Sequence, residues 1–191
     1  MKKIGWLKIY KIGLVILLAI TVIGFFYFEP LATLRAIVVI MAIFSLWQLT
    51  KSSEIIVLLI LYLGLNDLSN LHYLVGVPMS LSMVAAFALT YFLFLSLVNL
   101  LGTQNILEKK FFQLYAWTIS LSILEFYVVM DFLPIDPRSK ALIITVLFYL
   151  LAKLFYLNVH SVLNFKKVVG YVISIILIFG FVYLVNLRLG F

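Results

Sequence analysis

Long apolar runs alternate with short polar breaks along nearly the whole chain. Charged residues, proline or glycine end each run, and the hydrocarbon core of a bilayer takes about 20 apolar residues of helix. The pattern therefore predicts an all-α fold, a polytopic transmembrane helical bundle of about seven helices. We expect the spans near residues 11–28, 31–50, 54–74, 77–101, 110–132, 139–160 and 167–188. All connections are short, so residues 1–191 are expected to form a single integral membrane domain.

The composition excludes a water-soluble fold. Hydrophobic residues make up 66% of the chain and charged residues 11%, and the mean hydropathy is +1.25. Soluble domains carry about twice that share of charge. The sequence contains no cysteine, which excludes disulfides, thiolate metal sites and cysteine nucleophiles.

The distribution of basic residues predicts the orientation. Cytoplasmic loops of membrane proteins carry an excess of lysine and arginine. With the N-terminus in the cytoplasm and seven crossings, most lysines fall on the cytoplasmic side and the C-terminus lies outside. The residues that this arrangement places inside are Lys2, Lys3, Lys8, Lys11, Lys51, Lys109, Lys110, Lys166 and Lys167. The outer side receives Glu29, Arg35, Asp67, Glu125, Asp131, Asp136, Arg138, Lys140 and Arg188.

The first apolar run is expected to be a retained span. A basic start followed by an apolar run also describes a secretory signal peptide. However, this run is long and ends at Glu29 and Pro30 with no cleavage site of small residues. We therefore count it as the first helix of the bundle.

The third run is less regular than the others. Residues 55–65 are apolar, but the polar stretch from Asn66 through Asp67 and Asn70 to His72 follows within the same predicted span. Irregular backbone at membrane depth is tolerated only where protein or water satisfies its polar groups. Either these side chains line a cavity, or the helix is broken there.

Glu125 stands inside the fifth span and shares a polar stripe with Tyr115, Thr118 and Ser122, spaced by three and four residues. A carboxylate at this depth costs about 2.5–3.5 kcal/mol on insertion scales. We expect it to face the interior of the bundle. Arg35 in the second span lies at a similar depth and is the expected ionic partner.

A second polar stripe follows the sixth span, where Lys153 recurs with Thr145, Tyr149, Tyr156 and His160. The lysine would face the fifth span, or its long side chain would extend to the cytoplasmic headgroups. Both placements stay open at this point.

The polar residues of the spans have two interpretations. They are structural contacts between helices, or they form a ligand or ion pocket that opens outward. The candidate cluster under either interpretation is Glu125, Arg35, Asp67, Asn66, Asn70, His72 and Lys153.

Catalytic and metal chemistry find little support in the sequence. His72 and His160 fall at opposite ends of the predicted bundle and cannot share an ion. Ser161 beside His160 has no accompanying oxyanion motif. Residues 63–67 are similar to the Gly-x-Gly-Asp signature of intramembrane aspartyl proteases, but the second glycine is missing. We assign no catalytic residue, no metal and no cofactor.

Three functions follow in order of preference. The first is a non-enzymatic component of a membrane assembly, because the chain has almost no mass outside the predicted spans and no energy-coupling motif. The second is a small transporter or solute-binding subunit that uses the outward pocket. The third is an intramembrane or lipid-acting enzyme, for which Asp131, Asp136 and Arg138 would supply the acid and base groups. The expected partners are the lipid bilayer and other membrane subunits, not nucleic acid, and the expected location is the cell membrane.

Overall fold

The computed structural model of the chain describes residues 2–49, 54–100, 109–160, 168–170, 173, 176–177 and 180. Within residues 2–160 they form six α-helices and one short π-helix, the described residues from 168 on are also helical, and no strand occurs among the described residues. The predicted all-α bundle is confirmed. Most of the predicted seventh span, 167–188, lies outside the described residues.

The helices follow the apolar runs closely. Their bounds are α1 Lys2–Phe28, α2 Ala32–Gln48, α3 Glu54–Asn70, η1 Leu71–Val75, α4 Met79–Leu100, α5 Lys109–Asp131 and α6 Pro137–Val159. Apart from the start of α1, each bound lies within two residues of the expected one when η1 is counted with α3. The helix α1 begins at Lys2 and therefore includes the basic residues that precede the first apolar run.

Five of these helices are long and apolar enough to cross a membrane, and α2, with 17 residues, is shorter. The chain is thus a multi-pass membrane protein by the length and composition of its helices. The orientation of the bundle in the membrane stays a prediction.

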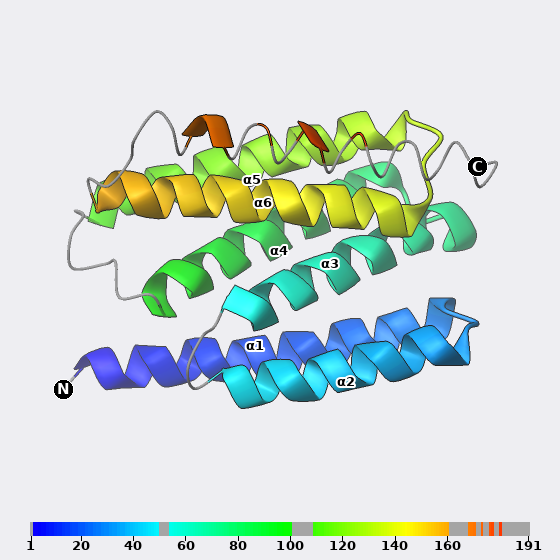
Figure 1. Ribbon diagram of the computed structural model, residues 1–191, viewed down its shortest axis with the longest axis horizontal. Coiled ribbons are helices and arrows are strands. Elements are labelled where there is room, and N and C mark those ends of the chain that lie inside the picture. The colour runs from blue at the N-terminus through cyan, green and yellow to red at the C-terminus, as the bar shows by residue number, and fades with distance from the viewer. Residues whose placement is uncertain are drawn as a thin grey trace.

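The helices pair into three layers, with α1 and α2 on one side, α5 and α6 on the other, and α3 and α4 between them (Figure 1). The central helix α3 contacts α1, α2, α4 and α6. Close approach depends on Gly64, because a Cβ there would lie 2.6 Å from Leu89 Cδ2 and 3.4 Å from Thr21 Cγ2. The core between α4, α5 and α6 is aromatic. The ring centroids of Phe94 and Phe155 are 5.3 Å apart, and the two rings meet edge-on.

The third span is not broken at its polar stretch. The α3 helix continues to Asn70 and widens into the π-helix η1 over Leu71–Val75. It stops at Gly76, whose φ of 79° is the left-handed conformation that glycine adopts without strain. The backbone of the polar stretch is therefore satisfied within a helix, and only its side chains need partners.

Candidate functional site

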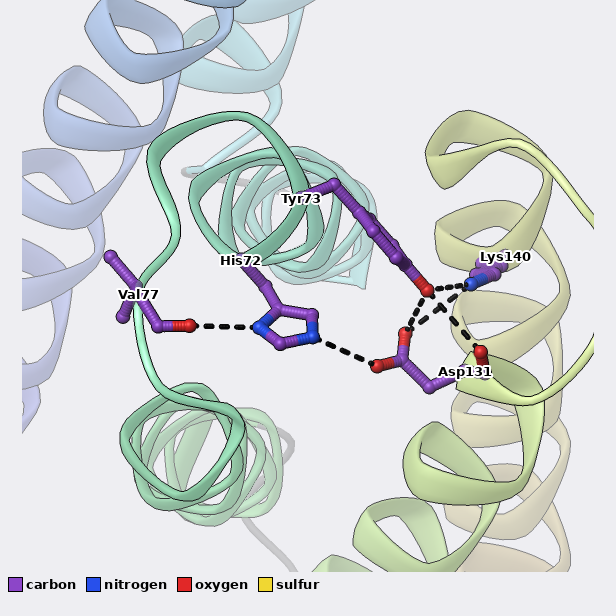
Figure 2. A network of polar contacts seen from close by, with 5 residues as sticks. All are labelled: His72, Tyr73, Val77, Asp131 and Lys140. Carbon is purple, nitrogen blue, oxygen red and sulfur yellow. Dashed lines mark hydrogen bonds and ion pairs between the residues drawn. The ribbon is translucent and has the colours of Figure 1, made fainter.

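One end of the bundle collects charged side chains from segments that are far apart in the sequence. The Tyr73 hydroxyl, on η1, donates a hydrogen bond to Asp131 Oδ1 at the end of α5, over 2.8 Å. Lys140, near the start of α6, donates to the Tyr73 hydroxyl at 2.6 Å and lies 3.3 Å from Asp131 Oδ1 (Figure 2). The Lys140 side chain is almost fully buried. Its charge is thus neutralised inside the protein and not by solvent.

His72 attaches to the same carboxylate from the other side. Its Nδ1 lies 2.8 Å from the carbonyl oxygen of Val77, and its Nε2 lies 3.7 Å from Asp131 Oδ2 (Figure 2). A carbonyl oxygen only accepts hydrogen bonds, so Nδ1 carries the hydrogen in the neutral ring. Nε2 then faces Asp131 Oδ2 as an acceptor.

A second ionic group lies at the same end, where α1 passes into α2. Glu29 is 3% exposed, and its Oε2 lies 3.0 Å from Nη2 of Arg138 in the first turn of α6. Its Oε1 accepts from the backbone N–H of Leu31 at 3.1 Å. Arg35 donates from Nε to the Glu29 carbonyl oxygen at 2.6 Å. Together these contacts join the α1–α2 connection to α6.

The two groups form what we call the polar layer, and local sequence explains how it is held. Pro137 begins α6, and Asp136 before it accepts from the backbone N–H groups of Arg138 and Ser139 through Oδ1. This cap fixes the start of the helix that supplies two of the cations. The polar layer consists of Glu29, Arg35, His72, Tyr73, Asp131, Arg138 and Lys140.

Further inside the bundle, α3 carries polar groups that lack partners. Asn66 is 2% exposed and Asp67 is 8% exposed. The Oδ1 atoms of both have no hydrogen-bond partner among the described residues, while the Asn66 side chain lies beside the Asp67 carboxyl group. The Ser69 hydroxyl, also without a partner in hydrogen-bonding geometry, faces the Tyr127 hydroxyl of α5. Buried polar groups are usually paired, so each of these exceptions requires a reason.

Glu125 does not face the interior, and this prediction was wrong. It is exposed on α5 together with Thr118 and Ser122, and Thr118 donates back to the Leu114 carbonyl at 2.9 Å. The face that α5 buries is the opposite one, which carries residues at three- and four-residue spacing. Its members are Phe112, Ala116, Ile119, Ile123, Tyr127 and Met130. Two residues along a helix correspond to about 200° of rotation, so the burial of Ile123 turns Glu125 away from the core.

The other predicted contacts also differ from expectation. Arg35 contacts the Glu29 carbonyl and lies 6.0 Å from the Phe26 ring centroid, and so it is not the partner of Glu125. Lys153 lies 3.6 Å from Glu54 Oε1 at the opposite end of the bundle, with side chains 30% and 28% exposed. Its ammonium is 5.5 Å from the ring centroid of Tyr156. The ammonium thus lies beside an aromatic ring, and the extension of Lys153 to the cytoplasmic headgroups stays a prediction.

The expected cluster is therefore divided among several places. Arg35 and His72 belong to the polar layer, Asn66 and Asp67 are buried below it, and Asn70 is partly exposed. Sequence reasoning assigned Glu29, Asp131, Arg138 and Lys140 to one side of the membrane without pairing them, and it missed Tyr73. The signal in the sequence that could have suggested these ion pairs was the presence of opposite charges at helix ends on the same predicted side of the membrane.

Next to Glu125, the outer surface of the bundle is hollowed. An open groove with a volume of about 420 Å³ runs between α4 and α5. Leu121 is one turn from Glu125 on the same face. The residues that line the groove are Ser80, Met83, Val84, Phe87, Trp117, Leu121 and Leu124. An apolar groove and a polar stripe thus share the outward side of α5.

Comparisons with known proteins return no match. This holds for protein-family models, for curated proteins and for solved structures alike. The functional argument therefore rests on the residues of this chain.

Proposed function

We propose that the protein is a non-enzymatic subunit of a membrane assembly and that the outward face of α5 is its docking surface. The single observation that carries the proposal is the exposure of Glu125 within a helix that is apolar enough to span a membrane. Glu125 lies six residues before the end of α5 at Asp131, which corresponds to about 9 Å of helical rise. The carboxylate is therefore well short of the end of α5, which supports a position at membrane depth.

A Glu125 side chain that is covered by a neighbouring helix costs less free energy at membrane depth than one that faces lipid. Insertion scales assign about 2.5–3.5 kcal/mol to an acidic side chain at membrane depth. Polar contacts between transmembrane helices contribute about 0.6–2 kcal/mol each. A neighbouring helix that supplies donors to Glu125, Ser122 and Thr118 would offset much of the cost. The groove beside them offers the apolar contact that such a helix needs.

The chemistry of the face favours a partner that differs from this chain. Between Phe112 and Asp131, α5 carries no lysine or arginine. A symmetric contact between two copies pairs the same surface with itself, and it would bring two carboxylates together without a cation from this helix. A transmembrane helix of another subunit that carries a basic side chain at the depth of Glu125 fits better.

The transporter alternative finds less support. It requires Arg35, Asp67 and Glu125 around one cavity that opens outward. Arg35 instead contacts the Glu29 carbonyl, Asp67 is buried against α1, and Glu125 is on the outer surface of α5. The cell membrane is the proposed location, because the predicted positive-inside arrangement fits a chain inserted there.

Site-directed photo-crosslinking tests the proposal. The chain has no cysteine, so a benzophenone maleimide can be attached to Ser122→Cys alone, in membranes of cells that express the variant at native level. Ile40→Cys on the exposed side of α2 is the matched control. We expect one defined intermolecular adduct from position 122 and none from position 40, with loss of the adduct in Glu125→Leu. Adducts only within the chain, or equal adducts at both positions, would contradict the proposal.

A further inference from the structure

Asp67 occupies an unusual position between two central helices. Its carboxyl group lies against Gly24 of α1, in the space that a Cβ at position 24 would take, with Asp67 Cγ 2.9 Å from that ideal Cβ position. Asp67 is 92% buried, since the exposed fraction of the residue is 8%. Oδ1 has no hydrogen-bond partner. The α1–α3 contact thus closes over a carboxyl group and leaves one of its oxygens unsatisfied.

The charged groups on the helices around Asp67 are engaged elsewhere or distant. Arg35 of α2 contacts the Glu29 carbonyl. On α6, Arg138 pairs with Glu29, Lys140 with Asp131, and Lys153 with Glu54. Lys11 of α1 is 13 residues before Gly24, or about 20 Å along the helix.

The remaining neighbours of α3 supply no cation either. Helix α4 contains no charged residue. On α3 itself, Glu54 is 13 residues away from Asp67. On η1, His72 Nδ1 is engaged by the Val77 carbonyl oxygen and Nε2 points toward Asp131 at 3.7 Å. No basic group of these elements thus compensates the charge of an ionised Asp67.

An ionised carboxylate without a partner is too costly in such an environment, and a buried acid takes up a proton to become neutral. We infer that Asp67 is a proton-binding site, held as a neutral carboxylic acid by the contact between α1 and α3. The O–H bond of the acid is the only bond that forms or breaks. Its proton comes from the water phase and returns there when α1 moves away from α3 and water reaches the carboxyl group.

This inference is independent of the docking surface on α5, because Asp67 belongs to the α1–α3 contact. It predicts a coupling between proton release and helix separation. The packed state binds one more proton at Asp67 than the open or unfolded state does. Stability must therefore fall as the pH rises, and Asp67→Asn, which resembles the neutral acid, should remove this part of the pH dependence.

Infrared spectroscopy of the full chain in phosphatidylcholine vesicles tests the inference. The protonated-carboxyl C=O band at neutral pH is measured for the wild type, for Asp67→Asn and for the control Glu125→Gln. We expect this band to lose one component in Asp67→Asn that Glu125→Gln retains. Equal protonated-carboxyl bands in the wild type and in Asp67→Asn would overturn the inference, since Asp67 would then be ionised.

A second measurement keeps the test decisive where Asp67→Asn does not fold. The chain has three aspartates, Asp67, Asp131 and Asp136. Carbon-13 labelling of their carboxyl carbons in the wild type allows solid-state NMR to count neutral acids and carboxylates. One neutral aspartate at neutral pH that is retained in both Asp131→Asn and Asp136→Asn supports the inference. Three carboxylates would overturn it.

Discussion

The carboxylate of Glu29 and the guanidinium of Arg138 are 3.0 Å apart, although one follows the first helix and the other begins the last described long helix. Glu29 is buried, whereas 46% of the Arg138 side chain is exposed. Removal of the arginine therefore leaves a buried carboxylate without its cation. The pair fixes the α1–α2 connection against α6.

Arg138→Gln should lower the free energy of unfolding by about 1–3 kcal/mol. This is less than the loss of about 3–5 kcal/mol when a fully buried pair is broken, because Arg138 is partly in solvent. Thermal unfolding in detergent micelles measures the effect. The double variant Glu29→Gln/Arg138→Gln is the control, and it should be more stable than Arg138→Gln alone. A single variant with wild-type stability would show that the pair is not formed.

Tyr73→Phe should destabilise the end of α3 by about 1–2 kcal/mol, since the hydroxyl makes two charge-assisted hydrogen bonds, to Asp131 and from Lys140. The effect should be local. Hydrogen–deuterium exchange is expected to increase over η1 and the first turn of α6, with little change in the middle of α4. Tyr27→Phe, on an exposed tyrosine of α1, is the control. Unchanged exchange in η1 would argue against the network.

Gly24→Ala should destabilise the protein by about 1–3 kcal/mol, because its Cβ would overlap the Asp67 carboxyl group. In Gly24→Ala/Asp67→Ala the overlap is absent, so the two changes should cost less together than the sum of their separate effects. Thermal unfolding of the four proteins of this double-mutant cycle gives the coupling. Strictly additive effects would mean that the two residues do not touch.

Lys153→Met should change stability by less than about 1 kcal/mol. Its ion pair with Glu54 is 3.6 Å long and partly exposed, and such pairs contribute little. Arg138→Gln, measured in the same way, provides the comparison. A larger loss of stability in Lys153→Met than in Arg138→Gln would contradict this prediction, because the Lys153–Glu54 pair would then stabilise the protein more than the Arg138–Glu29 pair does.

The apolar pattern was sufficient to predict helix positions, since each span must satisfy its own backbone and so follows the length of its apolar run. The polar stripes were also visible in the sequence. On α5, however, the pattern cannot show which side faces inward, because both the stripe with Glu125 and the face with Ile123 contain apolar residues. The choice depends on the neighbours α4 and α6, which is tertiary information.

The ion pairs and hydrogen bonds between distant segments could not be predicted from the sequence for a related reason. Asp131 and Lys140 were expected on the same side of the membrane, but many pairings of the charges there were possible. Tyr73 could not be singled out, because its hydroxyl contacts Asp131 from the π-helix η1, which follows α3. A change in helix type within an apolar run leaves no clear mark in the sequence.

The central claim is that the α5 face around Glu125 binds another subunit. The most direct test compares the particle sizes of wild type, Glu125→Leu and the control Glu54→Leu, extracted gently from their native membranes and separated by native electrophoresis. We expect the wild type and Glu54→Leu to migrate as the same large assembly and Glu125→Leu to migrate as the free, folded chain. An assembly of unchanged size in Glu125→Leu would contradict the account.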